Sequence, residues 1–420
     1  MNKIIYASEN PPTGLLNGVT TAVTNMRKAL GLTDADYIYI CPNKPKNKPQ
    51  ENVYELPSLG LSARWIPSWL ATIDEGYRFA LPYSFPLLGK AINRRLTSYL
   101  KNIQPCYPHI QGTQLTGEQV AMACLKANIP YILTLHTYDE HYLDDRIHIS
   151  LLRNFMKKNQ AKRSRYVADH AATVTCASLW YEKRYRDFTG YTGKIIIIPS
   201  IVWPFDLMNS QEKELEEHNF RTNELPSESR HRPLIGAFGR KSPEKNLDFA
   251  IEIMAQINLL CNNKKVIKEK RPLLVVIGPG AQGYEDLLKK LATKKEVIND
   301  ILFLPAKPNE QLLKVSQFIT VQIFTSLTET QGLIRVEAQL AQSVPLVMEN
   351  TALAENLDNP KLILPPQPQI WASTILKLLD DPHHLRETAR KQRDIALKQN
   401  DPNTYKRRLM ELYQNIQNKL

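Results

Sequence analysis

The sequence has no long hydrophobic run. Its longest apolar stretch, 195–205, is interrupted by Pro199, Ser200 and Pro204, whereas a membrane-spanning helix needs about 20 consecutive, mostly apolar residues. The first ten residues lead from one lysine into a short strand-like run, without the apolar segment and cleavage site of a signal peptide. We therefore predict a chain that neither spans a membrane nor is exported.

Cysteine is scarce as well. The 420 residues include five cysteines, which lie far apart and form no Cys-x-x-Cys pair. An odd number of separated cysteines suggests neither a disulfide framework nor a zinc site, so we expect buried, reduced thiols in a cytoplasmic protein. Hydrophobic residues make up 43% and charged residues 23%, a composition that excludes a largely disordered chain.

Acidic residues are too few to balance the basic ones. Residues 1–200 carry +9 of the net charge of +12. The densest basic stretch, 146–165, contains no acidic residue, and on a helix Arg146, Arg153 and Lys157 would share one face. This predicts either an anionic partner, such as a membrane surface or a phosphorylated acceptor, or the solvated face of a helix that packs by its other side. No nucleic-acid recognition motif accompanies the charge, so we expect no nucleic-acid binding.

Short β-branched runs alternate with longer helical segments, a pattern typical of repeated βα units. Several runs, such as 273–277, are wholly apolar, as are parallel strands covered by helices on both faces. We therefore predict an α/β protein with two doubly wound, Rossmann-like parallel sheets. The polar segment 206–231 is interpreted as the connection between two domains. The predicted strands are 3–7, 37–41, 130–135, 172–177, 194–198, 233–238, 272–278, 300–304, 319–324 and 344–348.

Two motifs have the spacing of ligand sites but the wrong context. Residues 278–283 carry a Gly-x-Gly-x-x-Gly fingerprint, yet the next strand ends in Pro305-Ala306-Lys307 instead of the acidic residue that a nicotinamide or flavin site requires. Asp34 and Asp36 are spaced like a metal-binding pair, but they precede a strand, whereas ligands bind where strands end. We expect neither a dinucleotide nor a metal cofactor.

Two other loops follow strands at the edge of the predicted sheet where ligands bind. Arg240 and Lys245 lie between the strand 233–238 and the helix that opens at Leu247. An arginine fork and a lysine beside a helix N-terminus can bind a diphosphate without a metal. Glu329 and Glu337 follow the strand 319–324, where both carboxylates can accept hydrogen bonds from sugar hydroxyls. The carboxyl ends of parallel strands are the ligand-binding edge of open α/β sheets.

At these residues the second half resembles the donor domain of the retaining GT-B glycosyltransferases, in particular the nucleotide-sugar-dependent family four. The Gly-Arg-x-x-x-x-Lys clamp of that family is matched by Gly239, Arg240 and Lys245. Its Glu-x7-Glu motif is matched by Glu329 and Glu337, with Gly332 at the glycine that presents backbone amides.

In the first half the resemblance is weaker. His136, at the end of the strand 130–135, matches the family's inter-domain histidine, and Gly18 matches a glycine of the first-domain turn. The resemblance implies two Rossmann-like domains facing across a cleft. Residues 1–204 would bind the acceptor, 205–400 would bind the donor, and the helix 401–420 would pack back on the first domain.

The resemblance also implies a mechanism. Arg240 and Lys245 would neutralise the departing nucleoside diphosphate, and Glu337 would bind the ribose. The amides near Gly332 and Leu333, with Glu329, would hold the donor sugar, and His136 would contact it near the reacting carbon. Gly18 would belong to the loop that binds acceptor or phosphate.

These features predict a retaining, metal-independent glycosyltransferase that uses a UDP-sugar and a glycan, lipid-linked or other hydroxyl acceptor. We expect it in the cytoplasm, with association to the inner face of a membrane through 146–165. The alternative is a non-catalytic GT-B partner or chaperone subunit. The sequence departs from the family at Asn17, Thr330 and Gln331, and the last two border the predicted sugar position.

Overall fold

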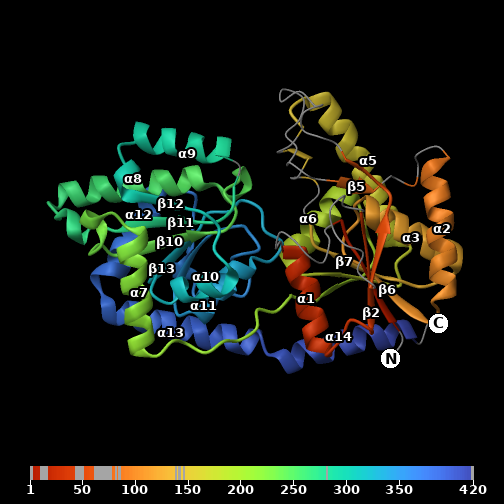
Figure 1. The fold of residues 1–420 in the computed structure, drawn as a ribbon. Helices are drawn as coiled ribbons and strands as arrows, with labels where there is room; N and C mark the ends of the chain where they lie inside the picture. The colour runs from red at the N-terminus through yellow and green to blue at the C-terminus, as the bar shows by residue number, and fades with distance from the viewer. Residues whose placement is uncertain are drawn as a thin grey trace. The chain divides into compact units, whose positions relative to one another are not determined.

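The computed structural model describes residues 3–9, 18–42, 52–60, 78–80, 83, 87–137, 140, 143–144, 147–280 and 282–417. The chain divides into two compact units. The first comprises Met1–Ile201 and Pro402–Leu420, and the second Val202–Asp401. Each unit is built on one parallel sheet, which confirms the predicted α/β class (Figure 1). In the described part of the chain, no helix combines the length and apolar character needed to cross a bilayer.

The first unit contains a seven-stranded sheet in the order β3-β2-β1-β6-β7-β8-β9. Its strands are β1 (Lys3–Ala7), β2 (Tyr37–Pro42), β3 (Val53–Leu56), β6 (Cys106–Ile110), β7 (Ile132–Leu135), β8 (Thr173–Cys176) and β9 (Ile195–Ile197). A separate antiparallel pair is formed by β4 (Ser58–Gly60) and β5 (Arg78–Ala80). The helices are α1 (Gly18–Leu30), α2 (Leu88–Asn102), α3 (Leu115–Ala127), α5 (Ser150–Asp169), α6 (Leu179–Thr189) and α14 (Pro402–Gln417).

The strand β6 was not predicted, although it lies at the centre of this sheet. It pairs with β1 on one side and β7 on the other. Its sequence, Cys-Tyr-Pro-His-Ile, contains a proline, which cannot donate a ladder hydrogen bond and normally marks an edge strand or a loop. Burial of the whole strand between neighbours outweighs that local preference.

The two faces of the first sheet differ in chemistry. One face is apolar and packs against α2 and α3, with Ile5, Ala7, Leu133, Leu135, Val174 and Cys176 pointing into that core. Because side chains alternate along a strand, the residues between them face the opposite layer. There His109 is fully buried and hydrogen-bonds with Thr134 Oγ1 (2.6 Å) and with Tyr413 Oη on α14 (2.7 Å). Burial lowers the pKa of His109 to about 3, so its ring is neutral.

The second unit contains a six-stranded parallel sheet in the order β12-β11-β10-β13-β14-β15. Its strands are β10 (Leu234–Phe238), β11 (Leu273–Ile277), β12 (Ile301–Leu304), β13 (Val321–Phe324), β14 (Val344–Met348) and β15 (Ile363–Leu364). Its helices are α7 (Ser210–Glu224), α8 (Leu247–Asn263), α9 (Gln282–Lys294), α10 (Asn309–Ser316), α11 (Leu333–Leu340), α12 (Pro368–Asp380) and α13 (Pro382–Gln399).

The segment 206–231, predicted as a connection, contains the helix α7. A capping box starts this helix, because Asn209 accepts from the amide of Glu212 and the Glu212 side chain accepts from the amide of Asn209. Only Phe220 is buried within it, and Phe220 joins the core on one face of the second sheet. A single buried position in a charged helix gives no apolar periodicity, which explains the wrong interpretation.

Some predicted features lie outside the described residues. They include Asn17 and Arg146. The five cysteines all lie within the description, and each is buried and outside any disulfide. The pair Asp34 and Asp36 belongs to the turn before β2, where Asp36 accepts from the amide and hydroxyl of Thr33, and Asp34 pairs with Arg27.

Candidate functional site

The predicted clamp residues and carboxylates meet where the order of strand addition in the second sheet switches from one side of β10 to the other. From β10 the chain builds β11 and β12 on one side and then returns to β13 on the other side of β10. The carboxyl ends of β10 and β13 are therefore neighbours, and the loops that leave them diverge. Such a switch point is the usual ligand crevice of an open α/β sheet.

The loop after β10 begins with a glycine in a conformation that side chains rarely adopt. Gly239 has φ +130°, and its amide donates to the carbonyl of Ile277 at the end of β11 (2.9 Å). The next loop approaches so closely that a Cβ on Gly278 would lie 1.8 Å from the carbonyl oxygen of Gly239. The glycine fingerprint at 278–283 thus lets two backbone loops touch, a role the sequence pattern alone did not distinguish from dinucleotide binding.

The two predicted cations lie on this loop. The Arg240 side chain is 54% exposed, and its guanidinium is 3.5 Å from the carboxylate of Glu244. Lys245 ends a short 3-10 helix, Pro243–Lys245, and its ammonium donates to Oε1 of Glu329. The structure therefore brings together two predicted site residues that are 84 positions apart in sequence.

Backbone contacts hold the loops after β10 and β13 together. The hydroxyl of Thr325 donates to the carbonyl of Lys245 (2.8 Å), and the amide of Leu327 donates to the carbonyl of Glu244 (3.1 Å). Asn246 adds a third bond to the carbonyl of Thr325 (3.3 Å). Each of these bonds ends on a main-chain carbonyl of one of the two loops, so the positions of Lys245 and Glu329 depend on each other.

Gly332 starts α11 in a left-handed conformation, with φ +79°. A Cβ at this position would lie 2.2 Å from Cδ2 of Leu353, so both the backbone angle and the packing require glycine. The amide of Arg335 donates to the carbonyl of Gly332 (3.0 Å), whereas the amides of Leu333 and Ile334 come too early in α11 for an intrahelical partner and can donate to an anion or a hydroxyl.

Glu337 lies about one turn into α11. Burial raises the pKa of its carboxyl to about 7, far above that of a carboxyl in water. A carboxylate that is costly to ionise when buried is typical of a binding or catalytic site, although structural groups show the same shift. Among the predicted donor residues, Glu337 therefore has the most perturbed environment.

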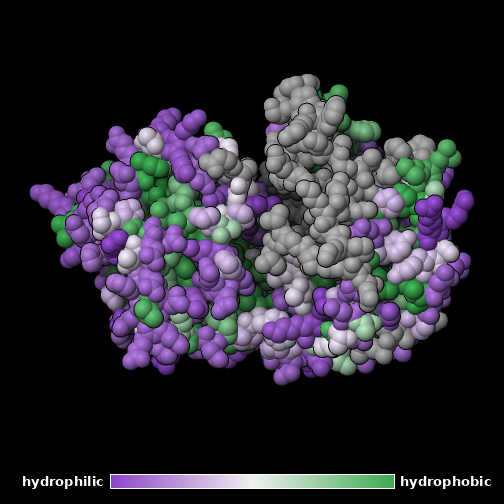
Figure 2. Space-filling model, viewed as in Figure 1, coloured by the Kyte–Doolittle hydropathy of each residue, from purple (hydrophilic) through white to green (hydrophobic). Residues whose placement is uncertain are grey.

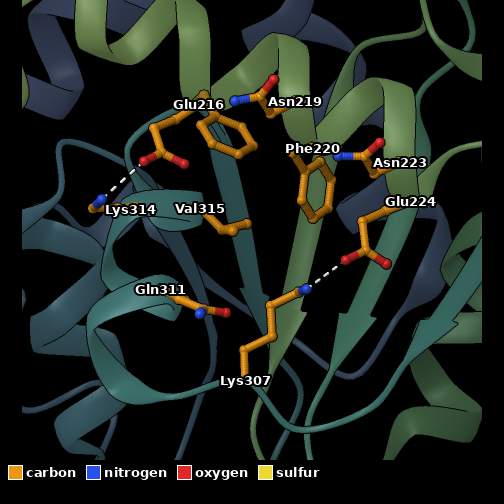
Figure 3. Close-up of a pocket in the computed structure, with 10 residues that line it drawn as sticks. Glu216, Asn219, Phe220, Asn223, Glu224, Lys307, Gln311, Lys314 and Val315 are labelled. Atoms are coloured by element: carbon orange, nitrogen blue, oxygen red, sulfur yellow. Dashed lines mark hydrogen bonds and ion pairs between the residues drawn. The ribbon is translucent and has the colours of Figure 1, made fainter.

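A small pocket is lined by both loops, with Gly239, Arg240, Lys245, Ser326 and Glu329 among its residues. A larger cavity, about 270 Å³, lies elsewhere in this unit, between α7 and α10. Ion pairs Glu216–Lys314 and Glu224–Lys307 cross it (Figure 3). None of the predicted site residues lines this larger cavity, so the smaller pocket is the candidate site.

In the first unit, the structure describes His136 and Gly18. His136 follows β7, and its Nε2 hydrogen-bonds with the side chain of Gln111, which follows β6 (2.7 Å). Burial lowers the pKa of His136 to about 4, so the ring is neutral near pH 7. Gly18 is exposed at the start of α1, and a Cβ there would meet none of the described atoms. Packing thus does not require glycine at 18, and its predicted role remains a prediction.

The basic stretch 146–165 corresponds largely to α5, and the two described cations of its predicted face, Arg153 and Lys157, are ion-paired. Lys157 pairs with Asp144 (2.9 Å) and Glu140 (3.0 Å), and Arg153 lies 3.4 Å from Asp144. These acidic residues precede the stretch, so counting charge within it could not reveal them.

Comparison with known proteins supports the resemblance. The model of the family "Glycosyltransferase Family 4" matches residues 16–202, and that of "Glycosyl transferases group 1" matches 221–396. The alpha-monoglucosyldiacylglycerol synthase of Acholeplasma laidlawii is 24% identical over 348 residues, which cover 80% of this chain and 77% of that enzyme.

Solved structures share the fold. Sucrose-phosphate synthase from Thermosynechococcus elongatus superposes with a TM-score of 0.72 at 15% identity and covers 100% of both chains. HepE from Anabaena, in complex with UDP, superposes with a TM-score of 0.69 at 14% identity and covers 98% of this chain and 99% of its own. With matching models on both halves and this fold, the chain is a GT-B glycosyltransferase that resembles family four.

Proposed function

We propose that the protein is a retaining glycosyltransferase that takes a sugar from a UDP-sugar without a metal ion. The observation that carries the proposal is the meeting of the Arg240–Lys245 loop with Glu329 at the switch point of the second sheet. The Anabaena structures of the same fold hold UDP, or UDP-glucose, which supports a uridine nucleotide as the donor.

Arg240 and Lys245 would stabilise the negative charge of the departing diphosphate. As the bond from the sugar to the diphosphate breaks, negative charge grows on the departing oxygen, and fixed positive groups stabilise it most in a site with little water. Arg240 offers a planar fork and Lys245 a point charge. Lys245 contacts Glu329, and this contact supports adjacent positions for the diphosphate and the donor sugar.

The remaining roles follow from position and from the resemblance. Glu337 would accept hydrogen bonds from the ribose hydroxyls, and Glu329 with the amides of Gly332 and Leu333 would hold the donor sugar. His136 and Gly18 enter on the resemblance alone, as contacts for the sugar and for the acceptor or a phosphate. The departures Thr330 and Gln331 border the sugar and are the positions that would alter which sugar is accepted.

For the acceptor we propose a hydroxyl of a glycan or lipid-linked molecule. The Acholeplasma relative, which aligns with 80% of this chain, is named for a glucosylated diacylglycerol. A lipid-linked acceptor would require the enzyme to work at a membrane surface. We therefore also propose peripheral association with the cytoplasmic face of a membrane, through a different face of α5 from the one predicted.

That face of α5 combines apolar side chains with cations. Leu151 is 81% exposed and Phe155 65% exposed, and Figure 2 shows hydrophobic surface over this helix. Lys158 and Lys162 follow at helical spacing and are also exposed, and the ion pairs among the described residues do not include them. Apolar side chains that enter the acyl layer, next to lysines that meet lipid phosphates, are how interfacial helices bind anionic bilayers.

The membrane proposal predicts which lysines matter. Lys158→Gln with Lys162→Gln should weaken binding to phosphatidylglycerol vesicles about 30-fold at low salt, because each lysine near an anionic surface contributes about 1 kcal/mol. The matched control, Arg153→Gln with Lys157→Gln, removes the same charge from the ion-paired side of α5 and should change binding far less. Co-sedimentation measures both, and equal losses in the two double variants would contradict this assignment.

The donor proposal is tested by nucleotide release from a panel of UDP-, GDP- and ADP-sugars, with and without EDTA. We expect slow release from a UDP-sugar that EDTA does not affect. Arg240→Ala and Glu329→Ala should abolish it, whereas Lys268→Ala, at an exposed position of the same unit, should not. Release that depends on a divalent metal would contradict metal independence. No release, with no shift of the melting temperature by UDP, would favour the non-catalytic partner.

A further inference from the structure

Lys241, beside the proposed clamp, is buried although it carries a charge. Only 4% of its side chain is exposed. Its ammonium lies 2.5 Å from Oε2 of Glu285 on α9 and donates to the carbonyl of Leu304 at the end of β12 (3.0 Å). An ammonium buried without such partners would be strongly destabilised, so the buried position of Lys241 depends on these contacts.

The main chain of the same residue holds a second loop. The amide of Lys241 donates to the carbonyl of Pro279 (2.6 Å), and Lys241 forms a parallel bridge with Gly280. The approach is close enough that a Cβ on Gly280 would lie 2.6 Å from Cβ of Lys241. One residue thus joins the loops that leave β10, β11 and β12.

Glu285 also pairs with Lys289 on its own helix (2.6 Å). Burial opposes ionisation of Glu285, but hydrogen bonds from Lys241 and Lys289 hold the pKa of its carboxyl below the usual value. The two lysines differ in exposure and in the segment to which they belong. Lys289 is 43% exposed on α9, whereas Lys241 is continuous with the loop that carries the clamp.

We propose that Lys241 is a positioning residue for the nucleotide: its buried pairing with Glu285 holds the 239–245 loop in the shape that presents Arg240 and Lys245 to the diphosphate. The proposal rests on the proposed function of that clamp. Arg240 itself is more than half exposed, and its described ion pair, to Glu244, lies within the same loop. Its placement therefore depends on the backbone that Lys241 anchors, not on contacts of its own guanidinium.

The test compares Lys241→Met with Lys289→Met. Methionine keeps the length of the lysine stem and removes the charge, and each variant takes one cation from Glu285. We expect Lys241→Met to bind UDP about tenfold more weakly by calorimetry, as for a site loosened by a fraction of an ångström. Lys289→Met should bind within about twofold of wild type. Glu285→Gln should resemble Lys241→Met.

A second readout does not depend on nucleotide. Hydrogen exchange should accelerate in peptides that contain the amides of Gly239 and Lys241 in Lys241→Met but not in Lys289→Met, both measured well below the melting temperature. Unchanged exchange would overturn the proposal. So would accelerated exchange with unchanged UDP affinity, because the loop's order would then not serve binding. If the wild type binds no nucleotide, the proposed function fails, and the exchange experiment still decides whether Lys241 orders the loop.

Discussion

Lys245→Met should lower kcat/KM for sugar transfer by about 10²-fold or more, because removal of one fixed group that stabilises transition-state charge costs this much in other enzymes. Methionine retains the unbranched stem, so packing in the loop changes little. The charge on the departing diphosphate is larger in the transition state than in the bound donor. We therefore expect most of the loss in kcat and less in KM. Steady-state nucleotide release, with the donor found in the panel, measures both.

The contact between Lys245 and Glu329 complicates this variant and also provides a control. Loss of the lysine leaves the Glu329 carboxylate without its cation, which adds a penalty unrelated to the diphosphate. The double variant Lys245→Met with Glu329→Gln closes a cycle that separates the two effects. Lys268→Met makes the same chemical change at an exposed position and should leave turnover unchanged. Near wild-type turnover in Lys245→Met would exclude Lys245 from the chemistry.

Glu337→Gln should stabilise the unliganded second unit at pH 8 while weakening its affinity for UDP. Burial raises the pKa of the Glu337 carboxyl to about 7 in the folded chain. In the unfolded chain the carboxyl titrates near its ordinary value, about 4.3. Between these values the folded state binds a proton that the unfolded state has lost, so stability falls as pH rises from about 4.3 to about 7. Glutamine removes that cost.

The expected gain is about 2 kcal/mol at pH 8 and none near pH 4, since the shift corresponds to a few kcal/mol and the side chain keeps some exposure. Thermal unfolding of wild type and variant across this pH range measures it. UDP should bind about tenfold more weakly to the variant, because an amide accepts hydrogen bonds less strongly than a carboxylate. Glu310→Gln, at an exposed position, is the control and should show neither effect. A parallel pH dependence in wild type and Glu337→Gln would contradict the buried-carboxyl assignment.

Most strands could be predicted because parallel strands between helix layers are apolar on both faces, as in the run 273–277. The two elements that were not predicted, β6 and α7, lack such an apolar pattern. In β6, a proline and a histidine interrupt the apolar pattern, and the histidine is accommodated by Thr134 and by Tyr413, the latter 304 residues away. In α7, a single buried phenylalanine is too little for a periodic signal.

Some residues of the candidate site could likewise be predicted from the sequence, and others could not. The types and spacing of Arg240, Lys245, Glu329 and Glu337 could be read from the chain, because each pair lies within one loop and the helix that follows it. Lys241 could not be recognised, since a lysine in a loop is ordinarily solvated, and its partners Glu285 and Leu304 lie 44 and 63 positions away. The ion pairs of Lys157 on α5 could not be predicted for the same reason, because the carboxylates that form them belong to the preceding segment.

The βα alternation, the two parallel sheets and the residue types of the donor loops could be read from the chain alone, because hydrophobic period and loop chemistry act over a few residues. Which charges meet depended on the folded arrangement. It placed Lys245 on Glu329, buried Lys241 against Glu285, and raised the pKa of Glu337 to about 7. Electrostatic energies depend on distance and desolvation in space, and neither quantity is encoded by proximity along the chain.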